Sequence, residues 1–92
     1  MLKGDGLRYL AQYASEGKQF DLIFADPPYE QGFVEKVVTS VDTSHVLADG
    51  GVLVTEHSKK EMIDEASLTK LEIRRQERYG ETVVSFLMHK KL

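Results

Sequence analysis

Apolar residues recur along the chain with two different spacings, and these spacings predict its helices and strands. Apolar positions three and four residues apart indicate helices, whereas short apolar runs bounded by turn residues indicate strands. The predicted order is a helix from residue 7 that ends near 15–17, a strand at 22–25, a helix at 33–41, a turn at 48–51, a strand at 52–56, a short helix or helical turn at 59–66, and two final strands on either side of a turn at 79–80.

The run Leu22 to Ala25 contains four consecutive apolar residues with no polar alternation. A strand with this pattern is expected to be buried on both faces, as a central parallel strand is. Pro27 and Pro28 cannot donate backbone hydrogen bonds, so the strand is predicted to end at Asp26. Because the carboxyl ends of strands face the ligand crevice in open α/β sheets, Asp26 is predicted to lie at a ligand site.

The order of elements predicts an α/β fold with a mixed sheet. Strand, helix and strand in succession form a right-handed parallel crossover, and the last two runs are typical of an antiparallel hairpin. The strand at 22–25 finds a predicted neighbour on one side only, the strand at 52–55. An unpaired apolar edge favours aggregation. We therefore expect either a homo-oligomer in which a second copy covers this strand, or a larger domain of which residues 1–92 are one half.

Composition narrows the classes of protein. The chain of 92 residues allows one small domain, and 41% hydrophobic with 29% charged residues is typical of a globular rather than a disordered protein. Without cysteine there is no disulfide or thiolate metal site. No apolar run approaches the ~20 residues of a membrane helix, so we expect a cytoplasmic protein without a membrane partner. The net charge of −3 argues against a generally basic nucleic-acid-binding surface but leaves a local patch open.

The sequence Asp26-Pro27-Pro28-Tyr29 has the groups needed to methylate an exocyclic amine of a base. Such an amine is a poor nucleophile because its lone pair is delocalised into the ring. Two acceptors, the Asp26 carboxylate and the Pro27 carbonyl, suit its two N–H bonds, and Pro28 stiffens the loop. Tyr29 supplies a ring on which a base can stack, worth ~1–3 kcal/mol. The alternative is a strand-ending turn with a surface tyrosine.

At these residues the chain resembles a known family. Asp26-Pro27-Pro28-Tyr29 after an apolar strand is similar to the catalytic motif of S-adenosylmethionine-dependent methyltransferases that modify adenine N6 or guanine N2. From Gly4-Asp5-Gly6 through Asp49-Gly50-Gly51 to Arg78-Tyr79-Gly80, the chain resembles the carboxyl-terminal half of the bacterial RsmD-like family. Members of that family have a Rossmann-like fold and methylate guanine N2 of 16S ribosomal RNA in the small ribosomal subunit.

The resemblance implies roles for individual residues. Asp26, Pro27, Pro28 and Tyr29 match the target-base motif, and Asp5 with Gly6 matches the segment that contacts the adenine of S-adenosylmethionine, with Asp26 also beside the cofactor. The family's glycine-rich first motif and its ribose-binding acid have no counterpart in residues 1–92. The resemblance thus implies a partial methyltransferase domain without its amino-terminal cofactor-binding half. Without the resemblance, Gly4-Asp5-Gly6 would be interpreted as a turn.

Two other functions stay open from the residues themselves. The same motif serves DNA adenine-N6 methyltransferases. A catalytically inert half-domain that acts as an oligomeric or binding module would explain both the unpaired strand and the missing motif.

Histidines and basic residues give weaker signals. His45, His57 and His89 are scattered without ligand spacing, so we expect exposed or structural roles and no metal site. A set of basic residues near the end of the chain predicts either a face that contacts RNA phosphates or an ordinary solvated hairpin with interleaved glutamates. The set consists of Lys70, Arg74, Arg75, Arg78, Lys90 and Lys91.

Overall fold

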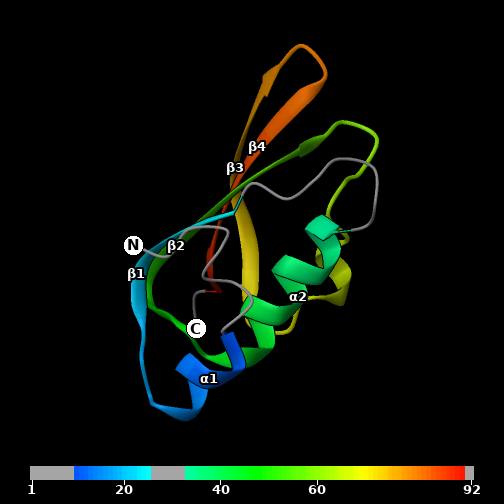
Figure 1. The fold of residues 1–92 in the computed structure, drawn as a ribbon. Helices are drawn as coiled ribbons and strands as arrows, with labels where there is room; N and C mark the ends of the chain where they lie inside the picture. Colours follow the sequence, from blue (N-terminus) through cyan, green and yellow to red (C-terminus); the bar gives the residue numbers. More distant parts are fainter. Residues whose placement is uncertain (1–9, 26–32, 91–92) are drawn as a thin grey trace.

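The computed structural model describes residues 10–25 and 33–90, and its elements follow the predicted order (Figure 1). The first strand begins two residues before the predicted run at 22–25, and the second strand extends beyond the predicted 52–56 at both ends. In chain order the elements are α1 (Leu10–Ser15), β1 (Phe20–Ala25), α2 (Phe33–Ser44), β2 (Leu47–Ser58), the 3-10 helix η2 (Glu65–Ser67), β3 (Leu71–Tyr79) and β4 (Thr82–His89).

The strands form one four-stranded sheet in the order β1-β2-β4-β3. β1 pairs with β2 in parallel, whereas β2 pairs with β4 and β4 with β3 antiparallel. This confirms the predicted mixed sheet with its final hairpin. Among the described residues β1 pairs with β2 alone, so it lies at an edge of the sheet, which confirms the predicted lack of a second neighbour.

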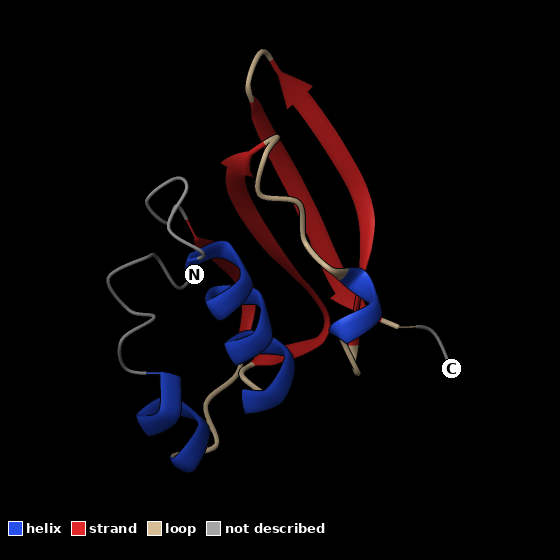
Figure 2. Ribbon diagram, turned by 90° about the vertical axis from the view of Figure 1, so that its right-hand side faces the viewer, coloured by secondary structure: helices blue, strands red, loops and turns tan. Residues whose placement is uncertain are grey.

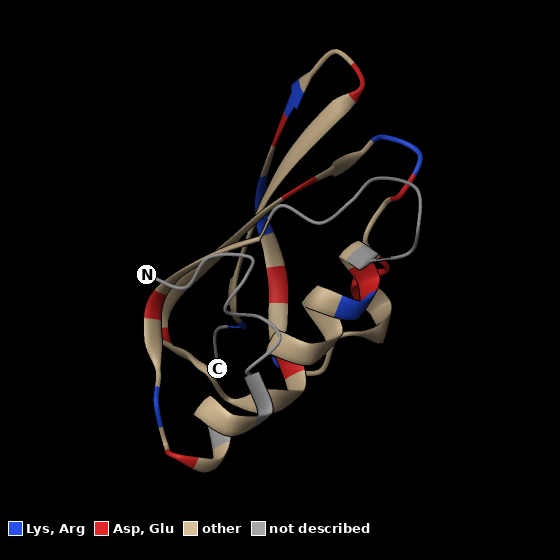
Figure 3. Ribbon diagram, viewed as in Figure 1, with Lys and Arg blue, Asp and Glu red and all other residues tan. Residues whose placement is uncertain are grey.

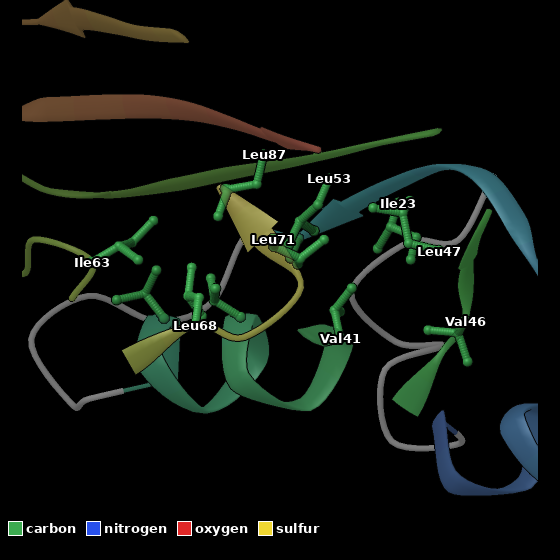
Figure 4. Packing of buried hydrophobic residues seen from close by; sticks show 12 residues of the cluster. Ile23, Val41, Val46, Leu47, Leu53, Ile63, Leu68, Leu71 and Leu87 are labelled. Carbon is green, nitrogen blue, oxygen red and sulfur yellow. The ribbon is translucent and has the colours of Figure 1, made fainter. Parts of the chain in front are cut away.

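The hydrophobic core lies between α2 and one face of the sheet (Figure 4). α2 contributes Val34, Val38 and Val41, each at most 2% exposed, and the sheet contributes residues from all four strands. Burying a side chain of this size stabilises the fold by ~1.5–3 kcal/mol, so this layer holds the helix to the sheet. The sheet and loop residues of the cluster are Ile23, Ala25, Val46, Leu47, Leu53, Ile63, Leu68, Leu71 and Leu87.

The prediction that β1 is buried on both faces is wrong. Ile23 and Ala25 are 0% exposed, whereas Leu22 and Phe24, which point to the opposite face, are half-buried. The two α-helices lie on the same side of the sheet (Figure 2). Because side chains alternate between the faces of a strand, every second residue of β1 faces away from that helical layer.

The predicted turn at 48–51 is also wrong, because β2 runs through it. Phe20 pairs with Leu47 and Leu22 pairs with Val52, so the four residues between the β2 partners form an irregular bulge opposite a single β1 residue. Gly50 adopts φ +81°, a conformation that glycine tolerates at little cost. A bulge thus uses the same glycine chemistry that a turn would use.

The segment before β3 contains less helix than predicted. Its helical part is η2 alone, and Ile63 and Leu68 on either side of it are 7% and 4% exposed. The Asp64 amide donates to Glu35 Oε1 on α2 at 2.7 Å. These anchors hold the segment along the core. The predicted turn at Tyr79 and Gly80 is confirmed, since Gly80 has φ +61° between β3 and β4.

Candidate functional site

The candidate site begins where β1 ends. Ala25, its last residue, pairs with Thr55 on β2, and both are 0% exposed. The structure therefore describes the strand that leads directly into the Asp-Pro-Pro-Tyr sequence. The motif itself, Asp26–Tyr29, and the predicted cofactor residues Asp5 and Gly6 lie outside the described residues.

Core residues anchor the chain on both sides of the 26–32 segment. Ala25 at the end of β1 is 0% exposed, and Val34, in the first turn of α2, is 2% exposed and belongs to the same buried cluster. The two ends of this segment are thus held by the same hydrophobic layer. A strand end and a helix start fixed in one core are suitable supports for a functional loop.

Buried polar side chains lie on β2 and β4, at the end of the sheet where β1 also ends. His57 near the end of β2 is 1% exposed and Ser85 on β4 is 0% exposed. His57 Nε2 lies 2.7 Å from Ser85 Oγ, and its Nδ1 lies 3.1 Å from the Ser58 carbonyl oxygen. Gln76 on β3 donates from Nε2 to Ser85 Oγ at 3.0 Å. The structural role expected for His57 is confirmed, but its partners were not predicted.

The other two histidines also have the roles expected of them. His89 Nε2 donates to the Leu47 carbonyl oxygen at 2.7 Å and so ties β4 to the start of β2. His45 is exposed, with φ +62°, and the Lys70 ammonium lies beside its ring. Within residues 10–25 and 33–90, no group of histidine and acidic side chains is placed to hold a metal ion, and neither α-helix is long and apolar enough to cross a membrane.

Asp42 is a buried carboxylate that the sequence analysis missed. It is 2% exposed and accepts hydrogen bonds from the backbone N–H groups of Thr69, Lys70 and Leu71 at 2.8–3.0 Å, and from the Thr69 hydroxyl at 3.0 Å. Burial acts to raise the pKa of Asp42, but these hydrogen bonds to the charged form outweigh it and hold the pKa below its usual value. The carboxylate fastens the end of α2 to the start of β3.

The basic residues of the hairpin do not form a continuous positive face. Arginine and glutamate alternate along β3 of the hairpin (Figure 3). Arg74 forms an ion pair with Glu72, and Arg75 forms one with Glu77. No ion pair with a described residue is recorded for Arg78, which is exposed. Two of the six residues in the predicted basic set, Arg74 and Arg75, are thus paired with glutamates as in an ordinary solvated hairpin, and Arg78 differs from them. Lys91 lies outside the described residues.

Comparison with known proteins relates this chain to methyltransferases. A protein family described as Conserved hypothetical protein 95 matches residues 1–88. The putative rRNA methyltransferase YlbH of Bacillus subtilis is 31% identical over 83 residues, which are 90% of this chain and 45% of that protein. The ribosomal RNA small subunit methyltransferase D of Buchnera aphidicola is 33% identical over 49 residues, 53% of this chain and 26% of that protein. The chain spans less than half the length of either relative.

Solved structures give the same relation at the level of the fold. The chain superimposes on a putative methyltransferase of Escherichia coli, yhhF, with a TM-score of 0.69 at 19% identity, over 94% of this chain and 45% of that one. The putative methylase HI0767 of Haemophilus influenzae gives a TM-score of 0.70 at 17% identity, over 94% of this chain and 52% of that one. The mixed sheet is therefore part of a Rossmann-like methyltransferase fold, as the resemblance implied.

Proposed function

Because the chain belongs to the family described as Conserved hypothetical protein 95, the RsmD family, we propose that it carries the target-base part of an S-adenosylmethionine-dependent methyltransferase. The acceptor is an exocyclic amine of a nucleic-acid base, and we propose guanine N2 of 16S ribosomal RNA. The observation that carries this proposal is the position of Ala25, buried at the carboxyl end of β1 beside Thr55. Asp26 follows it directly in the sequence, and α/β sheets bind ligands at the carboxyl ends of their strands.

The residues of the motif have distinct roles in this proposal. The Asp26 carboxylate and the Pro27 carbonyl accept the two N–H bonds of the amine and direct its lone pair toward the methyl group. Pro28 restricts the loop, and Tyr29 stacks on the base. S-adenosylmethionine supplies the electrophilic methyl group. Asp5 and Gly6, with Asp26, contact the adenine part of the cofactor.

The same proposal accounts for the length of the chain. The relatives are about twice as long, since this chain spans 45% of the Bacillus subtilis protein. We propose that residues 1–92 form a partial domain and that the remaining cofactor contacts belong to segments of the kind that the longer relatives contain. The substrate is ribosomal RNA or the small subunit, so the place of action is the cytoplasm.

A chimeric enzyme tests this function. The matched 83 residues of the Bacillus subtilis relative are replaced by the corresponding residues of this chain, with and without Asp26→Asn, and folding of both chimeras is checked by circular dichroism and thermal unfolding. We expect labelled methyl groups to enter small subunits isolated from cells that lack this methylation. Asp26→Asn removes a charged acceptor at the reacting amine, so a loss of about 100-fold is expected.

Two results would overturn parts of the proposal. A folded chimera with no more incorporation than its Asp26→Asn form would contradict methyl transfer through this motif. Incorporation into naked DNA but not into ribosomal RNA or small subunits would identify the DNA adenine-N6 alternative instead.

One observation favours a second candidate, an inert half-domain that exists as a homo-oligomer. β1 has an unpaired edge among the described residues, and its Leu22 and Phe24 are half-buried apolar side chains. Two copies that cover each other's β1 would bury this edge. Light scattering after size-exclusion chromatography of the 92-residue chain decides the matter, since a well-folded monomer would eliminate this candidate.

A further inference from the structure

A shallow cavity of about 290 Å³ lies between the loop after β2 and the β3–β4 hairpin. Val83, 5% exposed, is part of its lining, and Met62 is 53% exposed beside it. Ligand pockets for drug-sized molecules begin at ~300 Å³, so this cavity has room for a single ring system. The residues that line it are Met62, Gln76, Glu77, Arg78 and Val83.

With a neutral imidazole, the hydrogen bonds that join His57, Ser85 and Gln76 have a single possible order of donors and acceptors. A carbonyl oxygen only accepts, so His57 Nδ1 donates to the Ser58 carbonyl and Nε2 must accept. The Ser85 hydroxyl therefore donates to Nε2, and Ser85 Oγ is left to accept from Gln76 Nε2. This order fixes the orientation of the Gln76 amide, with its nitrogen toward the buried serine.

The buried network positions a side chain that is itself exposed. His57 and Ser85 are at most 1% exposed, whereas Gln76 is exposed in the lining of the cavity. Among the described residues, none donates a hydrogen bond to Gln76 Oε1. An oriented amide that presents a free acceptor and a second N–H can form hydrogen bonds with the edge of a base. Because both partners are buried, the orientation does not depend on solvent.

Arg78 gives the cavity a positive charge. Glu77 also lines the cavity, but it forms an ion pair with Arg75, and Arg78 has no recorded ion pair with a described residue. An unpaired guanidinium at the rim suits a phosphate group. The methionine side chain supplies an apolar, polarizable surface for a ring. These features together fit a nucleotide within a polyanion better than a neutral ligand.

The cavity lies on the same edge of the sheet as the carboxyl end of β1, which directly precedes the candidate motif in the sequence. Arg78 pairs with Val83 across the hairpin, and Val83 pairs with His57 on β2. His57 lies two residues beyond Thr55, the partner of Ala25 at the end of β1. An RNA strand that enters the motif can therefore reach the cavity along the carboxyl end of β2.

We propose that Met62, Gln76 and Arg78 form a subsite for one unpaired nucleotide of the RNA, separate from the target base. Gln76 accepts a hydrogen bond from the base, Met62 packs against its ring, and Arg78 contacts a phosphate. His57 and Ser85 are positioning residues that act through Gln76. The inference rests on the proposed function in taking RNA as the ligand.

Binding of short oligonucleotides tests the subsite without cofactor or methyl transfer. The probes are a fluorescein-labelled eight-nucleotide oligoadenylate and an abasic oligomer of the same length and charge, followed by fluorescence anisotropy at several salt concentrations. The 92-residue chain is compared with Gln76→Ala, Ser85→Ala and Arg78→Ala, and with Arg75→Ala as a matched control whose arginine is already paired. Thermal unfolding verifies that each variant is folded.

The expected pattern separates base contacts from phosphate contacts. Gln76→Ala and Ser85→Ala weaken oligoadenylate binding about threefold to tenfold, the range of one net hydrogen bond, and leave the abasic oligomer unaffected. Arg78→Ala weakens both probes and lowers the salt slope by about one. Arg75→Ala changes neither.

Two outcomes overturn the subsite. The subsite would be contradicted if the Gln76→Ala variant bound oligoadenylate as tightly as the parent chain does. Because Gln76 is exposed, its substitution is not expected to disturb folding, whereas substitution of the buried Ser85 could do so. An equal loss for the abasic oligomer would show a phosphate contact instead of a base contact. Either outcome leaves the chimera assay of Asp26 intact, so failure of the subsite is distinct from failure of the proposed function.

Discussion

The two faces of the sheet are built from alternate residues of the same strands but differ in how deeply their apolar side chains are buried. On the face toward α2, Ile23, Leu53 and Leu87 are 0% exposed. On the open face, defined here as the side away from α2, the residues between them in β1, β2 and β4 are also apolar but half-buried. These open-face residues are Leu22, Phe24, Val52, Val54, Val84, Phe86 and Met88.

This difference indicates that the strands are suited to a sheet that is covered on both faces. Residues apolar on both sides of a strand are typical of strands covered on both faces, and contiguous exposed apolar surface marks an interaction site. The described helices complete one face. The open face and the free edge of β1 meet along Leu22 and Phe24, so one additional layer could cover both. This agrees with the proposed partial domain.

Matched leucine substitutions on the two faces give the largest expected contrast. Leu53→Ala removes a fully buried side chain and leaves a cavity, so we expect a loss of about 2–5 kcal/mol in the free energy of unfolding. Leu22→Ala on the open face removes a side chain that is only half-buried, and the loss should stay below about 1 kcal/mol. Urea unfolding of both variants measures the difference. Equal losses would mean that the open face is covered in solution.

Asp42 provides a second test of packing on the face toward α2, with a buried polar side chain. Because hydrogen bonds lower its pKa, the ionised form stabilises the fold above the unfolded pKa of ~3.9, and this contribution is lost as the pH falls through the folded pKa. Asp42→Asn should cost about 1–3 kcal/mol at pH 7, and the gap should narrow as the pH falls below ~4.

The exposed Asp49→Asn is the control for Asp42→Asn. Urea unfolding at pH 7 and pH 3 measures all three proteins. A gap between Asp42→Asn and the parent that is the same at both pH values would contradict the assigned role of the carboxylate.

Substitution on the open face should have the smallest effect on stability and a visible effect on association. Phe24→Ser replaces a half-buried aromatic ring at the free edge with a small polar side chain. We expect a change of about 1 kcal/mol or less in unfolding, together with weaker binding of a hydrophobic dye and less concentration-dependent association in sedimentation velocity. Unchanged dye binding would show that this ring is not part of an accessible apolar surface.

Local patterns predicted the order of elements, the mixed sheet and the free edge of β1, because spacing and turn residues act over a few positions. They failed where distant residues decide the outcome. Gly50 and Gly51 have the chemistry of a turn, and only pairing with β1 makes them a bulge. Asp42 has the appearance of a solvent-facing helix residue, because its partners at 69–71 lie more than 25 positions away. The candidate motif at 26–29 was predicted from its residue types and order, and it lies outside the described residues.

We propose that this chain carries the target-base side of a methyltransferase site, and that segments beyond residues 1–92 complete its cofactor side. Calorimetric titration with S-adenosylhomocysteine, the demethylated form of the cofactor, tests it most directly. We predict no saturable heat with the 92-residue chain up to millimolar ligand, and micromolar binding, about −8 kcal/mol, with the chimera that restores the remaining segments. Micromolar binding to the 92-residue chain alone would contradict the account, since this chain or its oligomer would then complete the site unaided.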